Sequence, residues 1–235
     1  MKQTPLRLKA VILDMDGVVT NTMPDHFFAW QTALKEEGLH VTHLDIYRRE
    51  GQRGIMSVKE MFELYKKPYT LKKIQRILKR KEKLFKRIVK TRFIPGARGF
   101  LRFLHSRQVQ LALVTGTSRH EMHKILPDYL YDFFAVVITG SDVKKGKPHP
   151  EPYQKAIKLL QLTSKEVLVI ENAPLGIQSA KAAGLTCYAI ETSLPESYLR
   201  QADKIFLSIK DLQKNLKVKL SKNGNFPIAH RQHKD

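Results

Sequence analysis

Short apolar segments recur along this 235-residue chain, separated by stretches with helical periodicity. Strands that are covered on both faces by crossover helices are apolar along their whole length, so this pattern predicts a doubly wound α/β fold with a parallel sheet. The segments expected to form strands are Ala10–Leu13, Gln110–Val114, Ala135–Ile138, Val167–Ile170 and Cys187–Ile190.

The interval between the first and second apolar segments is too long for a single crossover, because it spans roughly 90 residues. Residues 21–90 within it are almost wholly helical in pattern. We therefore expect an all-helical domain, residues 22–92, inserted into an α/β core made of residues 1–21 and 93–220. Residues 221–235 have no periodicity and are expected to form a disordered tail.

The chain is strongly basic, with 42 Lys and Arg against 22 Asp and Glu and a formal charge of +20. Much of the excess lies in residues 66–92, where apolar residues recur at helical spacing. This indicates an amphipathic helix with a solvated basic face. The alternative is a positive field that attracts an anionic substrate or RNA.

The cysteine content and the N-terminal sequence indicate the cellular compartment in which the protein is expected. The single cysteine, Cys187, excludes an internal disulfide framework and a multi-cysteine zinc site, and it favours a reducing interior. The apolar run before Asp14 is too short for a signal peptide or a membrane span. We expect a cytoplasmic protein without membrane contacts.

Two carboxylates follow the first predicted strand directly, in the sequence Asp14-Met-Asp16-Gly17. In an open parallel sheet, ligands bind at the carboxyl ends of the strands, so both side chains are expected at a reaction centre. Asp and Gly after a strand also form simple turns. The four apolar residues before the pair make the turn alone a weaker interpretation.

This motif resembles the first motif of the haloacid dehalogenase superfamily, and three later segments match that family in order. Thr115 ends the segment LALVT, Lys147 lies in GKPHPEPY, and Glu171-Asn172 ends VLVIEN. The family resemblance implies a Rossmann-like core with a helical cap. The branch that the sequence resembles contains β-phosphoglucomutases and sugar phosphatases.

The resemblance implies phosphoryl transfer, with Asp14 as the nucleophile and Asp16 as the general acid and base. Thr115, with the backbone amides of Gly116 and Thr117 beside it, and Lys147 would bind the phosphoryl oxygens.

Mg²⁺ is the cofactor that the family implies. Its ligands would come from Asp14, Asp16, Glu171 and Asn172. Many members carry an acid where this chain has Asn172, so the site loses a negative charge. Weaker metal binding is expected unless Glu171 takes over.

Four residues of the predicted helical domain are candidates for substrate binding by the same resemblance: His26, Trp30, Arg53 and Lys81. His26 and Trp30 also suit an ordinary amphipathic helix, and a basic helix places a lysine at almost any chosen position. The matches of Arg53 and Lys81 are therefore loose.

The sequence predicts a magnesium-dependent phosphatase that acts on a small phosphorylated metabolite, a sugar phosphate being expected. The alternative is a β-phosphoglucomutase-like mutase. The remote alternative is a nucleic-acid-binding protein on the same scaffold, so nucleic acid is not an expected partner. A monomer or weak dimer is expected.

Overall fold

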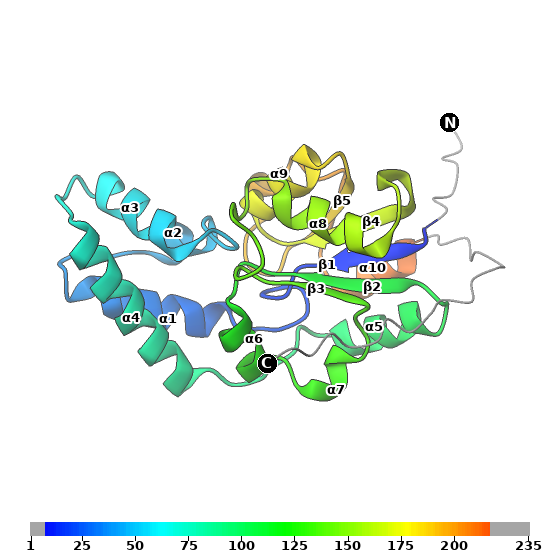
Figure 1. Cartoon of the computed structure of the whole chain (residues 1–235), viewed down its shortest axis with the longest axis horizontal. Coiled ribbons are helices and arrows are strands. Elements are labelled where there is room, and N and C mark those ends of the chain that lie inside the picture. The colour runs from blue at the N-terminus through cyan, green and yellow to red at the C-terminus, as the bar shows by residue number, and fades with distance from the viewer. Residues whose placement is uncertain (1–7, 217–235) are drawn as a thin grey trace.

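A six-stranded parallel sheet forms the centre of the molecule, and a group of helices lies beyond one end of its strands (Figure 1). The structure, a computed structural model, describes residues 8–216. The predicted tail, residues 221–235, lies outside the described residues. The doubly wound α/β fold predicted from the sequence is confirmed.

The strand order is β3-β2-β1-β4-β5-β6, and all neighbouring strands run parallel. The predicted bounds of the first two strands are confirmed, and the next three differ by one residue at one end. The strands are β1 Ala10–Leu13, β2 Gln110–Val114, β3 Val136–Ile138, β4 Val167–Glu171, β5 Thr186–Ile190 and β6 Lys204–Phe206.

Strand β6 was not predicted. It is a short edge strand that begins with a lysine, and only its last residue is fully buried. The other strands are apolar on both faces because helices cover the sheet on both sides. Alternate residues of β1 show this: Val11 and Leu13 belong to one hydrophobic cluster, and Ala10 and Ile12 to another.

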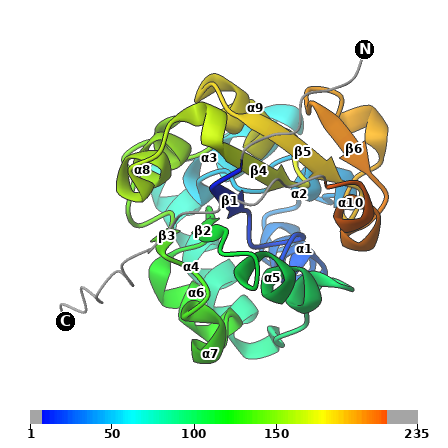
Figure 2. The ribbon, with the colours of Figure 1, turned by 90° about the vertical axis from the view of Figure 1, so that its right-hand side faces the viewer.

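Helices α8 and α9 cover one face of the sheet, and α5 and α10 cover the other (Figure 2). The helix α6, with α7 after it, packs into the same cluster as α5. The bounds are α5 Ala97–His105, α6 Arg119–Ile125, α7 Asp128–Tyr131, α8 Glu151–Leu160, α9 Pro174–Ala182 and α10 Ile209–Asn215. Short 3₁₀ helices span Ser164–Glu166 and Glu196–Tyr198.

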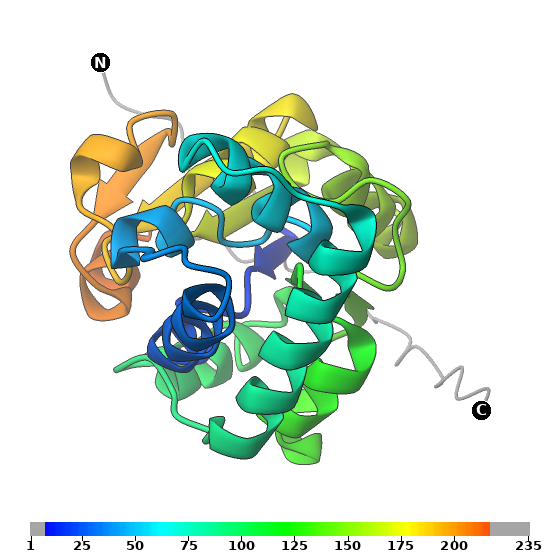
Figure 3. The ribbon, with the colours of Figure 1, turned by 90° about the vertical axis from the view of Figure 1, so that its left-hand side faces the viewer.

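Between β1 and α5 the chain forms four helices, which we call the helical insertion (residues 23–88). They are α1 Met23–Lys35, α2 His43–Tyr47, α3 Gly54–Leu64 and α4 Leu71–Ile88. Figure 3 views the molecule from this side. The helical insertion has a hydrophobic cluster of its own, centred on residues such as Leu34, Phe62 and Ile77, so it is a packed unit rather than a long loop.

Helix α4 is amphipathic, as its sequence predicts. Ile74, Ile77 and Phe85 are buried, and they lie on one face of the helix. Lys81 is buried on the same face, so not every basic residue of α4 belongs to the solvated side.

The two connections between the core and the helical insertion lie side by side. Thr20 and Phe93 form an antiparallel bridge, and the backbone N–H of Asn21 donates to the carbonyl oxygen of Arg92 at 2.8 Å. The chain therefore leaves the core and returns to it at one place, close to the end of β1.

Among the helices that the structure describes, none combines the length and the apolar character needed to cross a bilayer.

Candidate active site

The turn after β1 places both aspartates at the carboxyl end of the sheet. Parallel register aligns Leu13 with Leu113 of β2 and with Ile170 of β4, so the three strands end together. Gly17 has a φ of 90°, and a β-carbon there would lie 2.1 Å from the side-chain nitrogen of Asn172. The turn therefore requires glycine both for its backbone angle and for the close approach of Asn172.

Asp14 is held by a buried lysine. The Nζ of Lys147 donates to Oδ1 of Asp14 at 2.5 Å and to Oε1 of Glu171 at 2.6 Å. The hydroxyl of Tyr153 also donates to that Glu171 oxygen, at 2.6 Å. All four side chains are almost completely buried. The predicted third motif thus brings its lysine next to the predicted nucleophile.

Asp16 receives hydrogen bonds from three threonine hydroxyls. Thr22 donates to Oδ1, while Thr117 at 2.9 Å and Thr115 at 3.3 Å donate to Oδ2. His26 Nε2 lies 3.5 Å from Oδ1, and its ring stacks on Phe85 with centroids 4.0 Å apart. The carboxylate is therefore held by the turn after β2 in the core and by the start of α1.

The environments of these groups shift their pKa values. Burial alone would raise the pKa of Asp16, but hydrogen bonding and charge from His26, with the Thr22 and Thr117 hydroxyls, lower it to about 2. Burial raises the pKa of Asp14 to about 8; Lys147 opposes this rise, and Glu171 and Asp16 add to it. Burial alone would lower the pKa of Lys147, but Asp14 and Glu171 outweigh it and raise that pKa.

Two buried oxygens in this part of the molecule lack hydrogen-bond partners. Among the described residues, Oδ2 of Asp14 and Oδ1 of Asn172 are the buried side-chain atoms without one. A buried polar oxygen without a partner is costly, and carboxylate and amide oxygens are the ligands that Mg²⁺ prefers. The residues present therefore fit a hard divalent cation between the first and fourth motifs.

In the part of the chain that the structure describes, carboxylate, imidazole and thiol side chains do not form a complete metal site by themselves. Within residues 8–216, no three His, Cys, Asp or Glu side chains are grouped so that they could hold a metal ion by themselves. Both oxygens of Glu171 are already hydrogen-bonded: Oε1 to Lys147 and Tyr153, and Oε2 to the backbone N–H of Asn172 at 3.0 Å. The role of Glu171 as a metal ligand stays a prediction, and its placement instead orders the lysine and the fourth motif.

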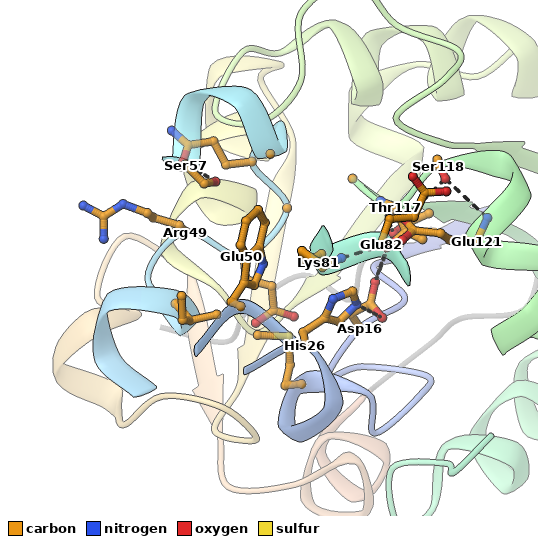
Figure 4. Close-up of a pocket in the computed structure, with 18 of the residues that line it drawn as sticks. Asp16, His26, Arg49, Glu50, Ser57, Lys81, Glu82, Thr117, Ser118 and Glu121 are labelled. Atoms are coloured by element: carbon orange, nitrogen blue, oxygen red, sulfur yellow. Dashed lines mark hydrogen bonds and ion pairs between the residues drawn. The ribbon is translucent and has the colours of Figure 1, made fainter. Parts of the chain in front are cut away.

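A cavity of about 420 Å³ opens above these groups and is lined by both parts of the molecule (Figure 4). In the close-up, Arg49, Glu50 and Ser57 of the helical insertion lie on one side, and Thr117 and Ser118 of the core on the other. The predicted site residues that line the cavity are Asp14, Asp16, His26, Trp30, Lys81, Thr115, Gly116 and Thr117.

Lys81 lies inside the cavity wall rather than on the basic surface. Its Nζ is 3.7 Å from Oε1 of Glu121 and lies over the rings of Trp30 and Phe85. Burial lowers the pKa of Lys81, and Glu121 and Asp16 oppose that shift. Lys81 is therefore a buried lysine of the cavity wall, beside an acid of the core.

Arg53 is placed differently from the prediction. It is exposed at the start of α3, and its guanidinium donates to the carbonyl oxygen of Lys144 at 2.7 Å. It is not among the residues that line the cavity, which the neighbouring Arg49 and Glu50 line instead. Arg53 joins the helical insertion to the core loop that carries Lys147.

Sequence reasoning missed Glu50, Thr22, Tyr153 and Glu121. Tyr153 lies six residues after Lys147 in the segment GKPHPEPY, and Thr22 follows the first motif, so both could have been found by extending those motifs. Glu50 and Glu121 lie at the cavity only because the helical insertion packs against the core. No local sequence pattern predicts which residues that packing brings together. The pKa of Glu50 is raised well above its usual range by burial and by the charges of Asp14, Asp16 and Glu171.

Comparisons with known proteins agree with this geometry. The chain is 32% identical to a "Phosphorylated carbohydrates phosphatase" of Thermotoga maritima over 76% of this chain and 82% of that one. It is 25% identical to "Beta-phosphoglucomutase" of Bacillus subtilis, over 87% and 92% of the two chains. A solved structure titled "Putative beta-phosphoglucomutase from Bacteroides vulgatus" is similar with a TM-score of 0.80 and 33% identity, over 90% of this chain and 88% of the other.

A family model described as "Haloacid dehalogenase-like hydrolase" matches residues 11–190, which include all four motifs and the whole helical insertion. The site residues predicted from those motifs are brought together in space, and on the strength of this match the chain belongs to the haloacid dehalogenase-like hydrolases.

Proposed function

We propose that the protein is a magnesium-dependent phosphatase that hydrolyses a small phosphorylated carbohydrate through an aspartyl-phosphate on Asp14. The observation that carries the proposal is the Asp14–Lys147 pair at 2.5 Å, at the base of a cavity that Asp16 also lines. A relative that covers most of this chain is named as a phosphatase of phosphorylated carbohydrates.

Asp14 is the nucleophile in this proposal. Its carboxylate attacks phosphorus in line with the leaving oxygen, so that a bond from Asp14 to phosphorus forms as the ester bond breaks. Lys147 stays charged beside it and offsets negative charge on the phosphoryl group. The hydroxyl of Thr115 and the backbone around Gly116 and Thr117 lie at the same cavity wall and can bind the phosphoryl oxygens.

Asp16 handles the protons. In its acid form it protonates the leaving alcohol, and in its ionised form it takes a proton from the water that attacks the aspartyl-phosphate. The threonine hydroxyls and His26 favour the ionised form. Nε2 of His26 lies 3.5 Å from Oδ1 of Asp16, so His26 positions this carboxyl group for the proton transfers.

Mg²⁺ would be held by a carboxylate oxygen of Asp14, the backbone carbonyl of Asp16 and Oδ1 of Asn172. When bound, it supplies positive charge that offsets the repulsion between Asp14 and a phosphate group. The oxygens of Asp14 and Asn172 that lack partners support this assignment.

The test is turnover combined with capture of the intermediate. The purified protein is given Mg²⁺ and a panel of phosphomonoesters, and released phosphate is measured with and without EDTA. Acid-quenched samples are then treated with hydroxylamine, which cleaves acyl phosphates. Wild type should release phosphate and carry hydroxylamine-labile phosphate. Asp14→Asn should do neither, while Asp128→Asn, an exposed aspartate of α7, should behave as wild type.

A mutase is the second candidate, because relatives named β-phosphoglucomutase cover most of the chain. A mutase must protect its aspartyl-phosphate from water and return the phosphoryl group to a sugar. The same incubation separates the two when isomerised product and free phosphate are followed together. Isomerisation that requires a catalytic sugar bisphosphate would replace the phosphatase proposal, and phosphate release without isomer supports it.

A further inference from the structure

The amide of Asn172 is fixed in one orientation by its neighbours. Its Nδ2 donates to both carboxylate oxygens of Glu50, each at 3.2 Å, and to Oγ of Ser193 at 2.9 Å. Its Oδ1 is buried and has no partner among the described residues. Both oxygens of Glu50 accept from the nitrogen end of the amide, so the oxygen end of Asn172 is turned away from Glu50.

Glu50 reaches Asn172 from the helical insertion. It lies in the loop between α2 and α3, 122 positions from Asn172 in the chain, and is 8% exposed. The same loop is seated on the core at two further places. The backbones of Gln52 and Lys147 form a parallel β-bridge, and the guanidinium of Arg53 donates to the carbonyl oxygen of Lys144. The Glu50–Asn172 contact therefore exists only while the helical insertion rests on the core.

The fourth motif lacks a negative charge at position 172, and Glu171 is not free to replace it. Its oxygens accept from Lys147, Tyr153 and the backbone of Asn172. Glu50 is the carboxylate that lies against the Asn172 side chain itself. The helical insertion thus supplies the group that orients the fourth-motif amide.

We propose that Glu50 is a positioning residue for the divalent cation: while the helical insertion rests on the core, it holds Asn172 with Oδ1 toward the cation. The inference rests on the proposed magnesium site. Partners of metal ligands commonly change metal affinity by 10–100-fold when they are removed. Metal affinity in this protein is therefore coupled to the position of the helical insertion.

The test is a double-mutant cycle read by calorimetric titration of Mg²⁺ into the substrate-free protein. Glu50→Gln keeps the shape of the side chain but removes its charge and half of its acceptor character. It should weaken Mg²⁺ binding about tenfold or more. Glu63→Gln, an exposed glutamate of α3 that makes the same change in net charge, should leave the affinity unchanged.

The second arm of the cycle uses Asn172→Asp. This variant loses the Nδ2 donor, so Glu50 no longer has an amide to orient. In this background Glu50→Gln should no longer weaken Mg²⁺ binding, because both oxygens of the new carboxylate are equivalent as ligands. A purely structural role for Glu50 would weaken binding equally in both backgrounds and would overturn the inference.

Two further outcomes separate this inference from the proposed function. If wild type binds Mg²⁺ and Glu50→Gln binds it with the same affinity, the inference is wrong while the phosphatase proposal stands. A change in KM for the phosphomonoester alone would then assign Glu50 to the substrate. If wild type binds no Mg²⁺ and needs none for turnover, the magnesium site itself is refuted. Trp30, the single tryptophan, lines the cavity and gives a second readout through its fluorescence.

Discussion

Gly51 and Gly116 pack backbone against backbone, so closely that a β-carbon on Gly116 would lie 2.5 Å from the carbonyl oxygen of Gly51. Gly51 belongs to the loop that also carries Glu50, and Gly116 follows β2 in the turn that lines the cavity. The helical insertion therefore seats on the core at a point where only glycine leaves enough room.

Gly116→Ala should lower kcat/KM at least tenfold, which corresponds to about 1.4 kcal/mol of transition-state stabilisation. The added methyl group meets a backbone atom that cannot rotate away, so the loop around Gly51 must move off the core. Steady-state kinetics with the best phosphomonoester measure the effect. Gly99→Ala is the matched control, since nothing lies within 4 Å of its β-carbon position. Equal kinetic constants for both variants would contradict the prediction.

Lys147→Met should destabilise the protein by about 3–5 kcal/mol in EDTA, because it leaves the carboxylates of Asp14 and Glu171 buried beside each other without their cation. Urea denaturation measures the free energy of unfolding. Lys147→Met combined with Glu171→Gln should recover part of the loss, because one of the two charges is removed. Activity should stay absent in both. Additive losses in the double variant would refute the ion pair as the cause.

Phe85→Leu should lower kcat about tenfold, because His26 loses the ring on which it stacks beside Asp16. The packing cost of this change should be about 1 kcal/mol, well below that of Phe85→Ala, for which we expect about 3–5 kcal/mol. Phe62→Leu is the control, since Phe62 is equally buried within the helical insertion. A similar fall in kcat for Phe62→Leu would show that loosened packing, and not His26, is responsible.

Glu166→Gln should lower Tm at neutral pH by about 2–4 °C, if the bonds lost are worth about 1 kcal/mol in a domain of this size. Hydrogen bonds from Lys9 and Thr163 lower the pKa of Glu166 from 4.5 to about 2. A lowered carboxyl pKa adds stability above pH 4.5 and loses it as the pH falls toward 2. The Tm difference between the variant and wild type should shrink below about pH 4.5. A constant difference down to pH 3 would contradict this assignment.

The sheet was predictable because its strands are buried on both faces. Continuous apolar segments gave the bounds of β1 and β2 correctly. Strand β6 was not predicted, because an edge strand of three residues needs few apolar residues and so gives no apolar segment. The motif residues at the ends of β1, β2 and β4 were predictable for a related reason, because parallel strands deliver their carboxyl ends to one place.

Contacts between the two parts of the molecule were not predictable in the same way. Arg53 was predicted to bind substrate, and the structure places it outside the cavity lining, where it joins the helical insertion to the core through Lys144. Glu50, three positions earlier, lines the cavity without any sequence pattern to mark it. Which residue of such a loop faces the site depends on how the helical insertion seats, and that depends on long-range packing at positions such as Gly116.

The bridge between Thr20 and Phe93 joins the two segments that connect the core to the helical insertion, so both connections lie at one place. The residues between Thr20 and Phe93 are joined to the core through this one pair of connections. Strand β1 itself is hydrogen-bonded to β2 and β4, which lie outside the insertion. Exchange of the helical insertion for a module of another length or shape would leave the pairing of the sheet intact, while His26 and the other cavity residues of the insertion would be replaced. Replacement of the helical insertion at this connection can therefore change the substrate without changing the sheet.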